Sequence, residues 1–119
     1  MTTLTAKQMA DQFDRAARDV DERVGKVVQA AAYAIRRDAY ESLADESDAH
    51  AYAGRSIQAD PVGPMTMQVG YANDIEGLAA AVEYGSATVA PTKALGSAAN
   101  REAPELQRIA PLAALKALR

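Results

Sequence analysis

The sequence predicts a single α+β domain, and three features of the 119-residue chain point to it. A helical hydrophobic pattern fills the first third, a strand-type alternation with a turn fills the middle, and a short helical stretch with an alanine-rich tail follows. The length fits one domain, because single domains commonly contain about 100–150 residues. The predicted order is a long N-terminal helix, a small antiparallel hairpin, a short central helix and a C-terminal helical segment.

The first predicted helix spans residues 5–43. Thr5 and Gln8 have the spacing of a capping box, and Leu4 and Met9 are placed for a hydrophobic staple. One helical face is apolar, with residues three or four apart: Met9, Phe13, Ala16, Val20, Val24, Val27, Ala31 and Ile35. Such a helix is about 58 Å long at roughly 1.5 Å per residue, more than a compact domain of this size spans. We therefore expect it to bend, most easily at Gly25, or to extend beyond its own domain.

The middle of the chain predicts a loop and then a hairpin. Residues 44–54 are polar, lack a clear period and end in glycine, which is typical of a loop. A strand pair is predicted within residues 55–71, where Met65, Met67, Val69 and Tyr71 alternate with polar or small residues. Residues 61–64, which contain two prolines and a glycine, predict the turn.

A second helix is predicted over residues 73–85. Asn73 and Glu76 have the spacing of another capping box. The expected buried face consists of Ile75, Leu78, Ala79 and Val82. Gly85 is expected to end the helix, because glycine adopts the left-handed cap conformation without strain.

Residues 91–119 form a predicted helical tail that is rich in alanine and basic residues. Pro104 is expected to begin a helix, and Pro111 to kink or restart one. The tail carries a net charge of +3 against −6 for residues 1–90, which gives −3 for the chain. An acidic body with a basic tail suits complementarity between copies, but the charges alone favour the alternative of an ordinary solvated surface.

Large apolar side chains are scarce. The chain is 49% hydrophobic, but 28 of those residues are alanine and none is tryptophan. A small domain with such a thin core buries limited surface, so we expect self-association. The absence of cysteine excludes disulfides, zinc–thiolate sites, iron–sulfur clusters and thiol nucleophiles. The sequence shows no membrane-spanning run of 18 apolar residues and no secretion signal in its first 15 residues.

No pattern in the sequence predicts catalysis, a cofactor or a metal. His50 is the single histidine and falls in the predicted loop, so we expect a surface role. Asp45, Glu46 and Asp48 are spaced somewhat like ligands of a hard cation, but the glycine and closing glutamate of a calcium loop are missing. Phosphate-binding and nucleophile motifs are absent, as is a basic or aromatic–arginine platform for nucleic acid. We expect a non-enzymatic protein.

Several short motifs together resemble those of a known family. They are Gly54-Arg55-Ser56-Ile57, a strand, Tyr71-Ala72, and Val82-Glu83-Tyr84-Gly85-Ser86 followed by a proline. This succession is similar to the tail-completion family of long-tailed double-stranded DNA bacteriophages, which are small head–tail joining or minor tail proteins of the neck. The layout covers nearly the whole chain, and the specific motifs cover about residues 54–95.

The chain departs from the family pattern in two places. Tyr71-Ala72 precedes Val82-Glu83 by ten residues, which is farther than the family often shows, and Ala80-Ala81 stands near the usual position. After the proline, Thr92-Lys93-Ala94-Leu95 lacks the family's aromatic residue and second proline. These departures put the docking of the C-terminal segment in question.

The resemblance implies a structural virion protein, assembled in the host cytoplasm and located in the neck or tail. It would form a homo-oligomeric ring, sixfold by resemblance, that joins the tail to the head connector beside other neck and tail proteins. DNA would pass through without sequence-specific binding, and no membrane would be involved. Six copies at −3 each carry −18, which opposes adhesion of DNA where acidic faces line the passage. Two alternatives stay open: a tail terminator ring, and an acidic chaperone-like module whose apolar helix holds a client segment.

Two groups of residues are candidate assembly contacts. Val20, Val24 and Val27 belong to the apolar stripe of the first helix. Glu83, Tyr84 and Gly85 form a corner at the end of the second, where tyrosine offers an amphipathic ring and glutamate a charge to a neighbouring subunit. The alternative is that Tyr84 packs locally and Glu83 faces solvent.

Overall fold

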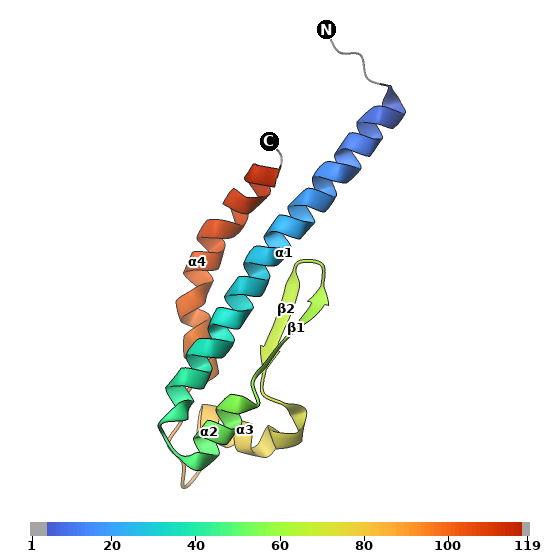
Figure 1. Cartoon of the computed structure of the whole chain (residues 1–119). Coiled ribbons are helices and arrows are strands. Elements are labelled where there is room, and N and C mark those ends of the chain that lie inside the picture. The colour runs from blue at the N-terminus through green and yellow to red at the C-terminus, as the bar shows by residue number, and fades with distance from the viewer. Residues whose placement is uncertain (1–4, 118–119) are drawn as a thin grey trace.

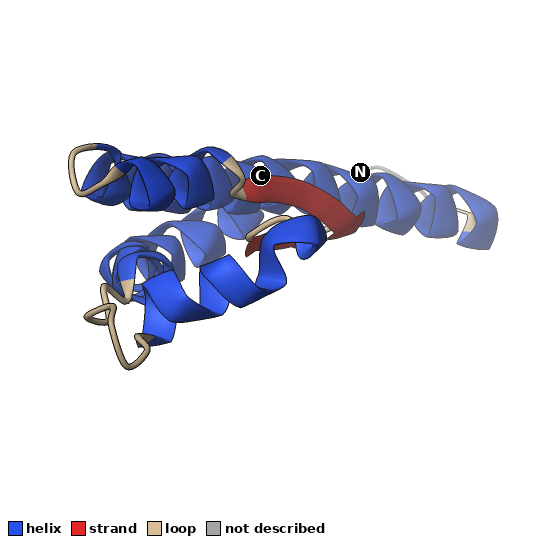
Figure 2. Ribbon diagram, turned by 90° about the horizontal axis from the view of Figure 1, so that it is seen from below, coloured by secondary structure: helices blue, strands red, loops and turns tan. Residues whose placement is uncertain are grey.

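Helix α1 (Ala6–Ala44) is the longest element of the computed structural model, which describes residues 5–117 (Figure 1). It is followed by α2 (Asp48–Arg55), strands β1 (Gln58–Gly63) and β2 (Thr66–Gly70), the 3-10 turn η1 (Asn73–Ile75), α3 (Glu76–Tyr84) and α4 (Ala94–Ala117). α4 runs antiparallel beside α1, and α2 and α3 close the end at which α1 stops. Figure 2 shows the same elements from below, with the curved hairpin beside the long helices. The predicted fold class and element types are confirmed.

The start of α1 forms the predicted capping box. The Thr5 side chain accepts from the N–H of Gln8 at 3.2 Å, and the Gln8 side chain accepts from the N–H of Thr5 at 2.9 Å. Leu4, the other half of the predicted staple, lies outside the described residues. The described part of the molecule measures 73 × 26 × 18 Å, so α1 extends beyond the body, which is the second of the two predicted alternatives.

Gly25 has a different role from the one the sequence suggested. α1 continues through it as one helix, whereas the sequence suggested Gly25 as the easiest point for a bend. A Cβ atom at Gly25 would lie 2.8 Å from the carbonyl oxygen of Pro64, in the turn of the hairpin. Glycine therefore allows the hairpin turn to lie directly on α1.

The prediction of a loop over residues 44–54 is wrong, because most of this segment forms α2. Ser47 caps the helix: its Oγ accepts from the N–H of His50 at 3.2 Å and lies 2.6 Å from Nδ1 of the same residue. Ala53 and Gly54 are buried on its inner side. The helix has eight residues, which is too short for a clear hydrophobic period.

The hairpin forms as predicted but turns later. β1 and β2 are antiparallel, with a register that runs from Gln58 opposite Gly70 to Gly63 opposite Thr66 and is irregular between Pro61 and Gly63. Three of the four predicted turn residues therefore belong to β1. Of the predicted inward side chains, those of Met67, Val69 and Tyr71 are half-buried, whereas Met65 is exposed at the turn.

The second predicted capping box does not form. Asn73 lies in η1 and not before an α-helix, so Glu76 becomes the first residue of α3 instead of its third. No side chain caps either start. The predicted apolar face is correct, since Ala79 and Val82 are buried and Ile75 and Leu78 pack against the core.

The expectation that Pro104 begins a helix is wrong, and so is the expectation of a restart at Pro111. α4 begins ten residues before Pro104 and runs through both Pro104 and Pro111. Both prolines are exposed, as are Asn100 and Gln107, the residues four positions before them. Proline removes the hydrogen bond to the carbonyl four residues earlier, and on this outer side water can replace it.

The core is small and lies where α1, α2, α3 and the start of α4 meet. Its fully buried large side chains are Leu43, Ile57 and Val82. Apart from Leu43, the buried residues of α1 and α4 are alanines, which we call the alanine seam: Ala32, Ala39, Ala94 and Ala98. Among the described helices, none combines the length and the apolarity needed to cross a membrane.

Candidate functional site

The predicted corner at residues 83–85 is the joint between α3 and α4. The N–H of Thr92 donates to the carbonyl of Val82, and the N–H of Lys93 donates to the carbonyl of Glu83, both at 3.0 Å. The Thr92 hydroxyl also donates to the Val82 carbonyl at 2.8 Å. Carbonyls in the last turn of a helix lack partners inside that helix. The segment that leads into α4 therefore supplies them.

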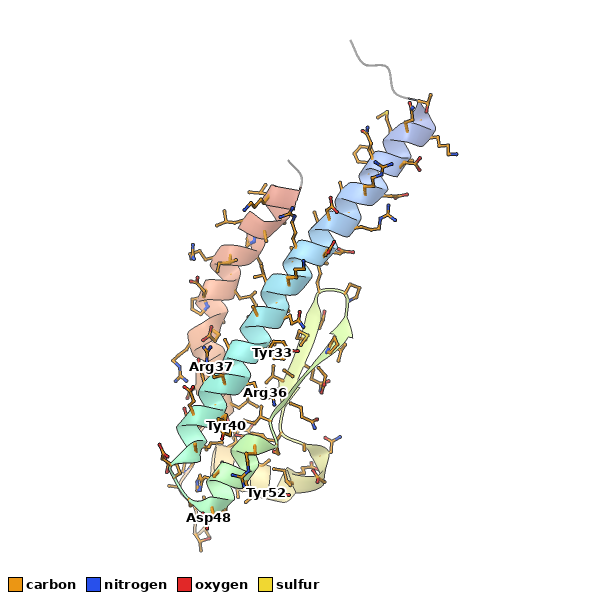
Figure 3. The ribbon with its side chains drawn as sticks, viewed as in Figure 1. Tyr33, Arg36, Arg37, Tyr40, Asp48 and Tyr52 are labelled. Carbon is orange, nitrogen blue, oxygen red and sulfur yellow. The ribbon has the colours of Figure 1, made fainter. Side chains whose placement is uncertain are left out.

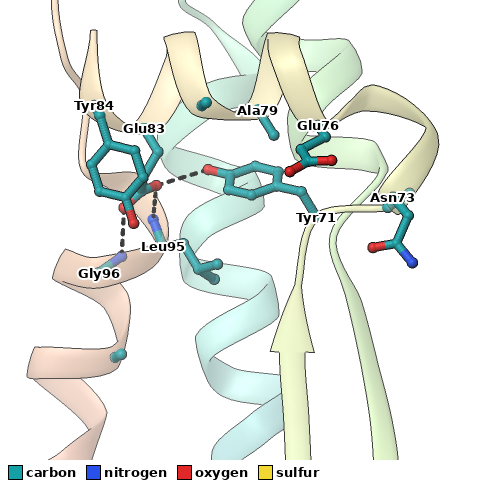
Figure 4. A pocket seen from close by; sticks show the side chains of 11 residues that line it. Tyr71, Asn73, Glu76, Ala79, Glu83, Tyr84, Leu95 and Gly96 are labelled. Carbon is teal, nitrogen blue, oxygen red and sulfur yellow. Dashed lines mark hydrogen bonds between the residues drawn. The ribbon is translucent and has the colours of Figure 1, made fainter.

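The Glu83 carboxylate binds the beginning of α4 (Figure 4). Its Oε1 accepts from the N–H of Leu95 at 3.0 Å, and its Oε2 accepts from the N–H of Gly96 at 3.0 Å. The residue is only 7% exposed. The first N–H groups of a helix are unpaired and carry partial positive charge, which favours a carboxylate at this place. Glu83, a residue of α3, thus caps the N-terminus of α4.

Tyr71 completes the network from the end of the hairpin. Its hydroxyl donates to Glu83 Oε1 at 2.9 Å. Burial raises the pKa of Tyr71 above its ordinary range, and the hydrogen bond to Glu83 and the charge of that carboxylate raise it further. Tyr71 therefore remains a neutral donor at neutral pH. One carboxylate links β2, α3 and α4.

The prediction that Glu83 offers its charge to a neighbouring subunit is wrong, and so is the alternative that it faces solvent. Both carboxylate oxygens are used inside the chain. Tyr84, by contrast, is 76% exposed. It borders a cavity of about 470 Å³ whose lining includes Tyr71, Glu76, Ala80 and Leu95. Within the predicted corner, Tyr84 is the side chain that is available to a partner.

Gly85 has the positive φ that the sequence predicted, but not the left-handed helical conformation. Its φ of 86° is combined with a ψ of 169°, an extended backbone that essentially only glycine adopts. A Cβ atom here would lie 2.9 Å from Cδ of Pro91 and 3.1 Å from the carbonyl oxygen of Val89. Gly85 is thus required by both its conformation and its surroundings, and it serves the joint rather than a partner.

The valine stripe of α1 is partly covered within the chain. Val20, Val24 and Val27 are half-buried, and Val27 lines a crevice with Leu106 and Ile109 of α4. Whether they also contact a second subunit stays a prediction.

The same stripe continues, uncovered, towards the start of α1. Phe13 is 68% exposed and Met9 is 45% exposed. Both residues belong to the predicted apolar face, yet they were missing from the candidate contacts. The sequence does not show where α4 ends along α1, and so it does not show that Met9 and Phe13 remain exposed.

The described residues do not converge on a reactive centre. Within residues 5–117, no three His, Asp or Glu side chains are grouped to hold a metal ion. Over the same range, every buried side-chain nitrogen and oxygen has a hydrogen-bond partner. Asp45, Glu46 and Asp48 lie at the α1–α2 connection and the first turn of α2, and His50 pairs with Ser47.

Comparisons of the chain with protein-family models, with curated proteins and with solved structures find no match, so the likeness to tail-completion proteins rests on the sequence motifs alone.

Proposed function

We propose that the chain is a non-enzymatic structural subunit of a bacteriophage neck, which assembles into a closed homo-oligomeric ring and joins the tail to the head connector. The observation that carries the proposal is the bare N-terminal end of α1. It projects from the body of a molecule 73 Å long and bears the exposed apolar side chains of Met9 and Phe13.

A projecting helix with an apolar face is stable when another surface covers that face. Neighbouring subunits of a ring provide such a surface at every copy, including the last, because a closed ring leaves no free end. The small core supports the same conclusion, since a domain that buries few large side chains gains from burying more on assembly. The motif resemblance supports a phage neck as the type of assembly.

The proposal is tested by the mass and shape of the purified full-length chain. Native mass spectrometry and negative-stain microscopy should show one discrete ring. Phe13→Asp should abolish the ring and leave the helix content of the chain unchanged, because Phe13 is 68% exposed and lies outside the core. The matched control is Arg15→Asp on the same exposed stretch, which should keep the ring. Particles assembled without this protein should join heads to tails when the wild-type ring is added, but not with the Phe13 variant.

Two results would replace the proposal by one of its alternatives. A ring that halts polymerisation of tail-tube protein, without promoting head joining, would identify a tail terminator. A chain that stays monomeric or dimeric at all concentrations and binds an unstructured peptide through Phe13 would identify a chaperone-like module.

A further inference from the structure

A groove with aromatic and basic walls lies where α1 meets α2. Tyr33, Arg36, Arg37 and Tyr40 of α1 line it, together with Gly54 and Arg55 of α2. Figure 3 shows the four α1 side chains in succession along the helix, leading to α2. The groove has a volume of about 520 Å³, which is within the range of small-ligand sites, and both tyrosines are exposed. We call it the Tyr–Arg groove.

The two tyrosines of the groove lie in one line along α1. They are seven residues apart, so their side chains leave the helix within about 20° of each other and about 10.5 Å apart along its axis. Arg36 and Arg37 fall between them and leave the helix on either side of that line. Each arginine is three positions from one tyrosine and four from the other, which is the spacing of neighbouring side chains on a helix. The α1 wall thus carries two cations between two aromatic rings.

α2 completes the groove because Gly54 lets it pack directly on α1. Gly54 is buried, and a Cβ atom there would lie 3.3 Å from Cβ of Leu43 and 3.6 Å from Cα of Tyr40. The next residue, Arg55, then enters the lining. The sequence did not predict an aromatic–arginine platform, because Arg55 is 15 residues beyond Tyr40 and the helix that brings it back to α1 was not predicted.

The arginines of the groove have few carboxylate partners. Neither Arg36 nor Arg55 forms an ion pair with any residue of the range 5–117, and Arg37 reaches only its neighbour Asp38, at 3.5 Å. Two further acids, Glu41 one turn beyond Arg37 and Asp48 two turns before Arg55, pair with neither. Among the described residues, no aspartate or glutamate belongs to the lining. The groove therefore presents positive charge on a chain whose net charge is −3.

This lining fits a ligand that is both flat and anionic. Tyrosine rings and guanidinium groups stack on the faces of nucleic-acid bases, and guanidinium groups also pair with phosphates in a directed way. A bound peptide is typically anchored by apolar side chains in apolar pockets, but the lining contains no leucine, isoleucine, valine, methionine or phenylalanine. The bases of a duplex already stack on one another, so an unpaired strand can use the tyrosines better than a duplex can.

We propose that the Tyr–Arg groove binds single-stranded nucleic acid. Bases stack on Tyr33 and Tyr40, and backbone phosphates pair with Arg36, Arg37 and Arg55. Stacked bases are about 3.4 Å apart, so the distance of about 10.5 Å between the tyrosines corresponds to about three base steps, and about four nucleotides reach both rings. Every base has a face that can stack, so the site tolerates different sequences. The site lies within one chain, and the inference goes beyond the proposed ring without depending on it.

Strands with and without bases test the class of ligand. The full-length chain is titrated at fixed salt against fluorescent twelve-nucleotide strands, and binding is followed by anisotropy. Single-stranded DNA and RNA of the same sequence should both bind, the same sequence as a duplex should bind more weakly, and an abasic strand should bind at least tenfold more weakly, because it keeps the phosphates but offers nothing to stack. If the abasic strand or the duplex binds as tightly as the single strand, the groove does not recognise unpaired bases and the proposal is wrong.

Variants of the groove test its aromatic residues. Tyr33→Leu should weaken binding of the single strand roughly fivefold or more, whereas Tyr33→Phe keeps the ring and should bind like the wild type. Tyr33 is exposed, and circular dichroism checks the helix content of both variants. Equal weakening by leucine and phenylalanine contradicts stacking on this ring.

The salt dependence of binding tests the arginines. Arg36→Ala with Arg55→Ala should weaken binding and make the plot of log affinity against log salt concentration shallower by about 1.4, because each phosphate contact of a single strand contributes about 0.7 to the slope. The matched control is Arg15→Ala with Arg18→Ala, which removes the same charge from exposed positions on the same side of α1, at least about 27 Å from Arg36. The control should leave the slope unchanged, and an equal effect of the two pairs contradicts the site.

The remaining outcomes separate this site from other partners and from the ring. If the groove variants bind strands as the wild type does, nucleic acid does not bind in the groove and the proposal fails. If a synthetic peptide of alternating glutamate and phenylalanine binds through Tyr33 and no strand does, the partner is a protein and the proposed ligand is wrong. If native mass spectrometry shows no ring but strands bind through the groove, the ring function fails and this inference stands.

Discussion

Replacement of Glu83 by alanine should destabilise the monomer itself, although the residue was first considered as a contact with a neighbour. The change removes a carboxylate that is 7% exposed and accepts three hydrogen bonds. Two of the donors are N–H groups in the first turn of α4, and the third is the Tyr71 hydroxyl. All three lose their partner at once in the variant.

The size of the effect follows from these three donors. Loss of a helix cap costs about 0.5–2 kcal/mol, and a buried hydroxyl without a partner costs about 1–3 kcal/mol. We therefore expect the free energy of unfolding to fall by about 2–5 kcal/mol. For a domain of this size the melting temperature should fall by roughly 10 °C or more. Glu83→Gln keeps one acceptor oxygen but not the charge, so its cost should be about 1–2 kcal/mol.

Urea unfolding followed by circular dichroism measures these differences. The comparison must use a variant or concentration at which the chain is monomeric, because assembly also adds to apparent stability. The matched control is Glu76→Ala, which removes an exposed carboxylate from the same cavity wall and should change stability by less than about 1 kcal/mol. If Glu83→Ala is as stable as this control, the carboxylate does not hold the joint and the reasoning is refuted.

Three further changes test other parts of the structure. Gly85→Ala should lower the free energy of unfolding by about 2–4 kcal/mol, whereas Gly77→Ala, in a helix and with open space around it, should leave it equal or raise it by up to about 1 kcal/mol. The pKa of Tyr71 is higher in the folded than in the unfolded chain, so the contribution of the neutral tyrosine to stability is complete below about pH 10 and is lost as the pH rises towards the folded pKa. Urea unfolding midpoints should show this decline at alkaline pH, and Tyr71→Phe should remove it. The pKa of Glu102 is raised by its hydrogen bond with Asp38. Protonated Glu102 therefore stabilises the folded chain below about pH 4, and this contribution is lost as the pH rises through the raised pKa. Melting temperatures at pH 4 and pH 7 should differ less in Glu102→Gln than in the wild type, and an unchanged difference contradicts this assignment.

Local patterns predicted the parts of the fold that depend on neighbouring residues. The capping box at Thr5, the length of α1 and the alternation in β2 all follow from side chains a few positions apart. Prediction from the sequence failed where tertiary contacts or solvent exposure determine the local structure. α2 is too short for a visible period, and Pro111 lies inside a helix because its outer face is open to water.

The candidate site was predicted less well, and for a physical reason. The partners of Glu83 lie 12 and 13 residues away in the chain, and two of them, Leu95 and Gly96, become available only because α4 begins at Ala94. No periodic pattern reports such a contact. Exposure of Tyr84 was part of the predicted corner contact, and the alternative that Tyr84 packs locally is wrong. The sequence placed Phe13 on the apolar face of the first helix, but the exposure of its side chain depends on where α4 ends.

The small side chains of the alanine seam have a mechanical consequence. Alanine side chains let two helices come close, but they form shallow ridges that resist swinging or sliding only weakly. The firm attachment of α4 is at its first turn, where the joint with α3 holds it. α4 contains 24 residues and is about 36 Å long, so a tilt of about 10° at the joint would move its far end by roughly 6 Å. A change in the angle at the Glu83 joint would therefore alter the spacing between the far end of α4 and α1.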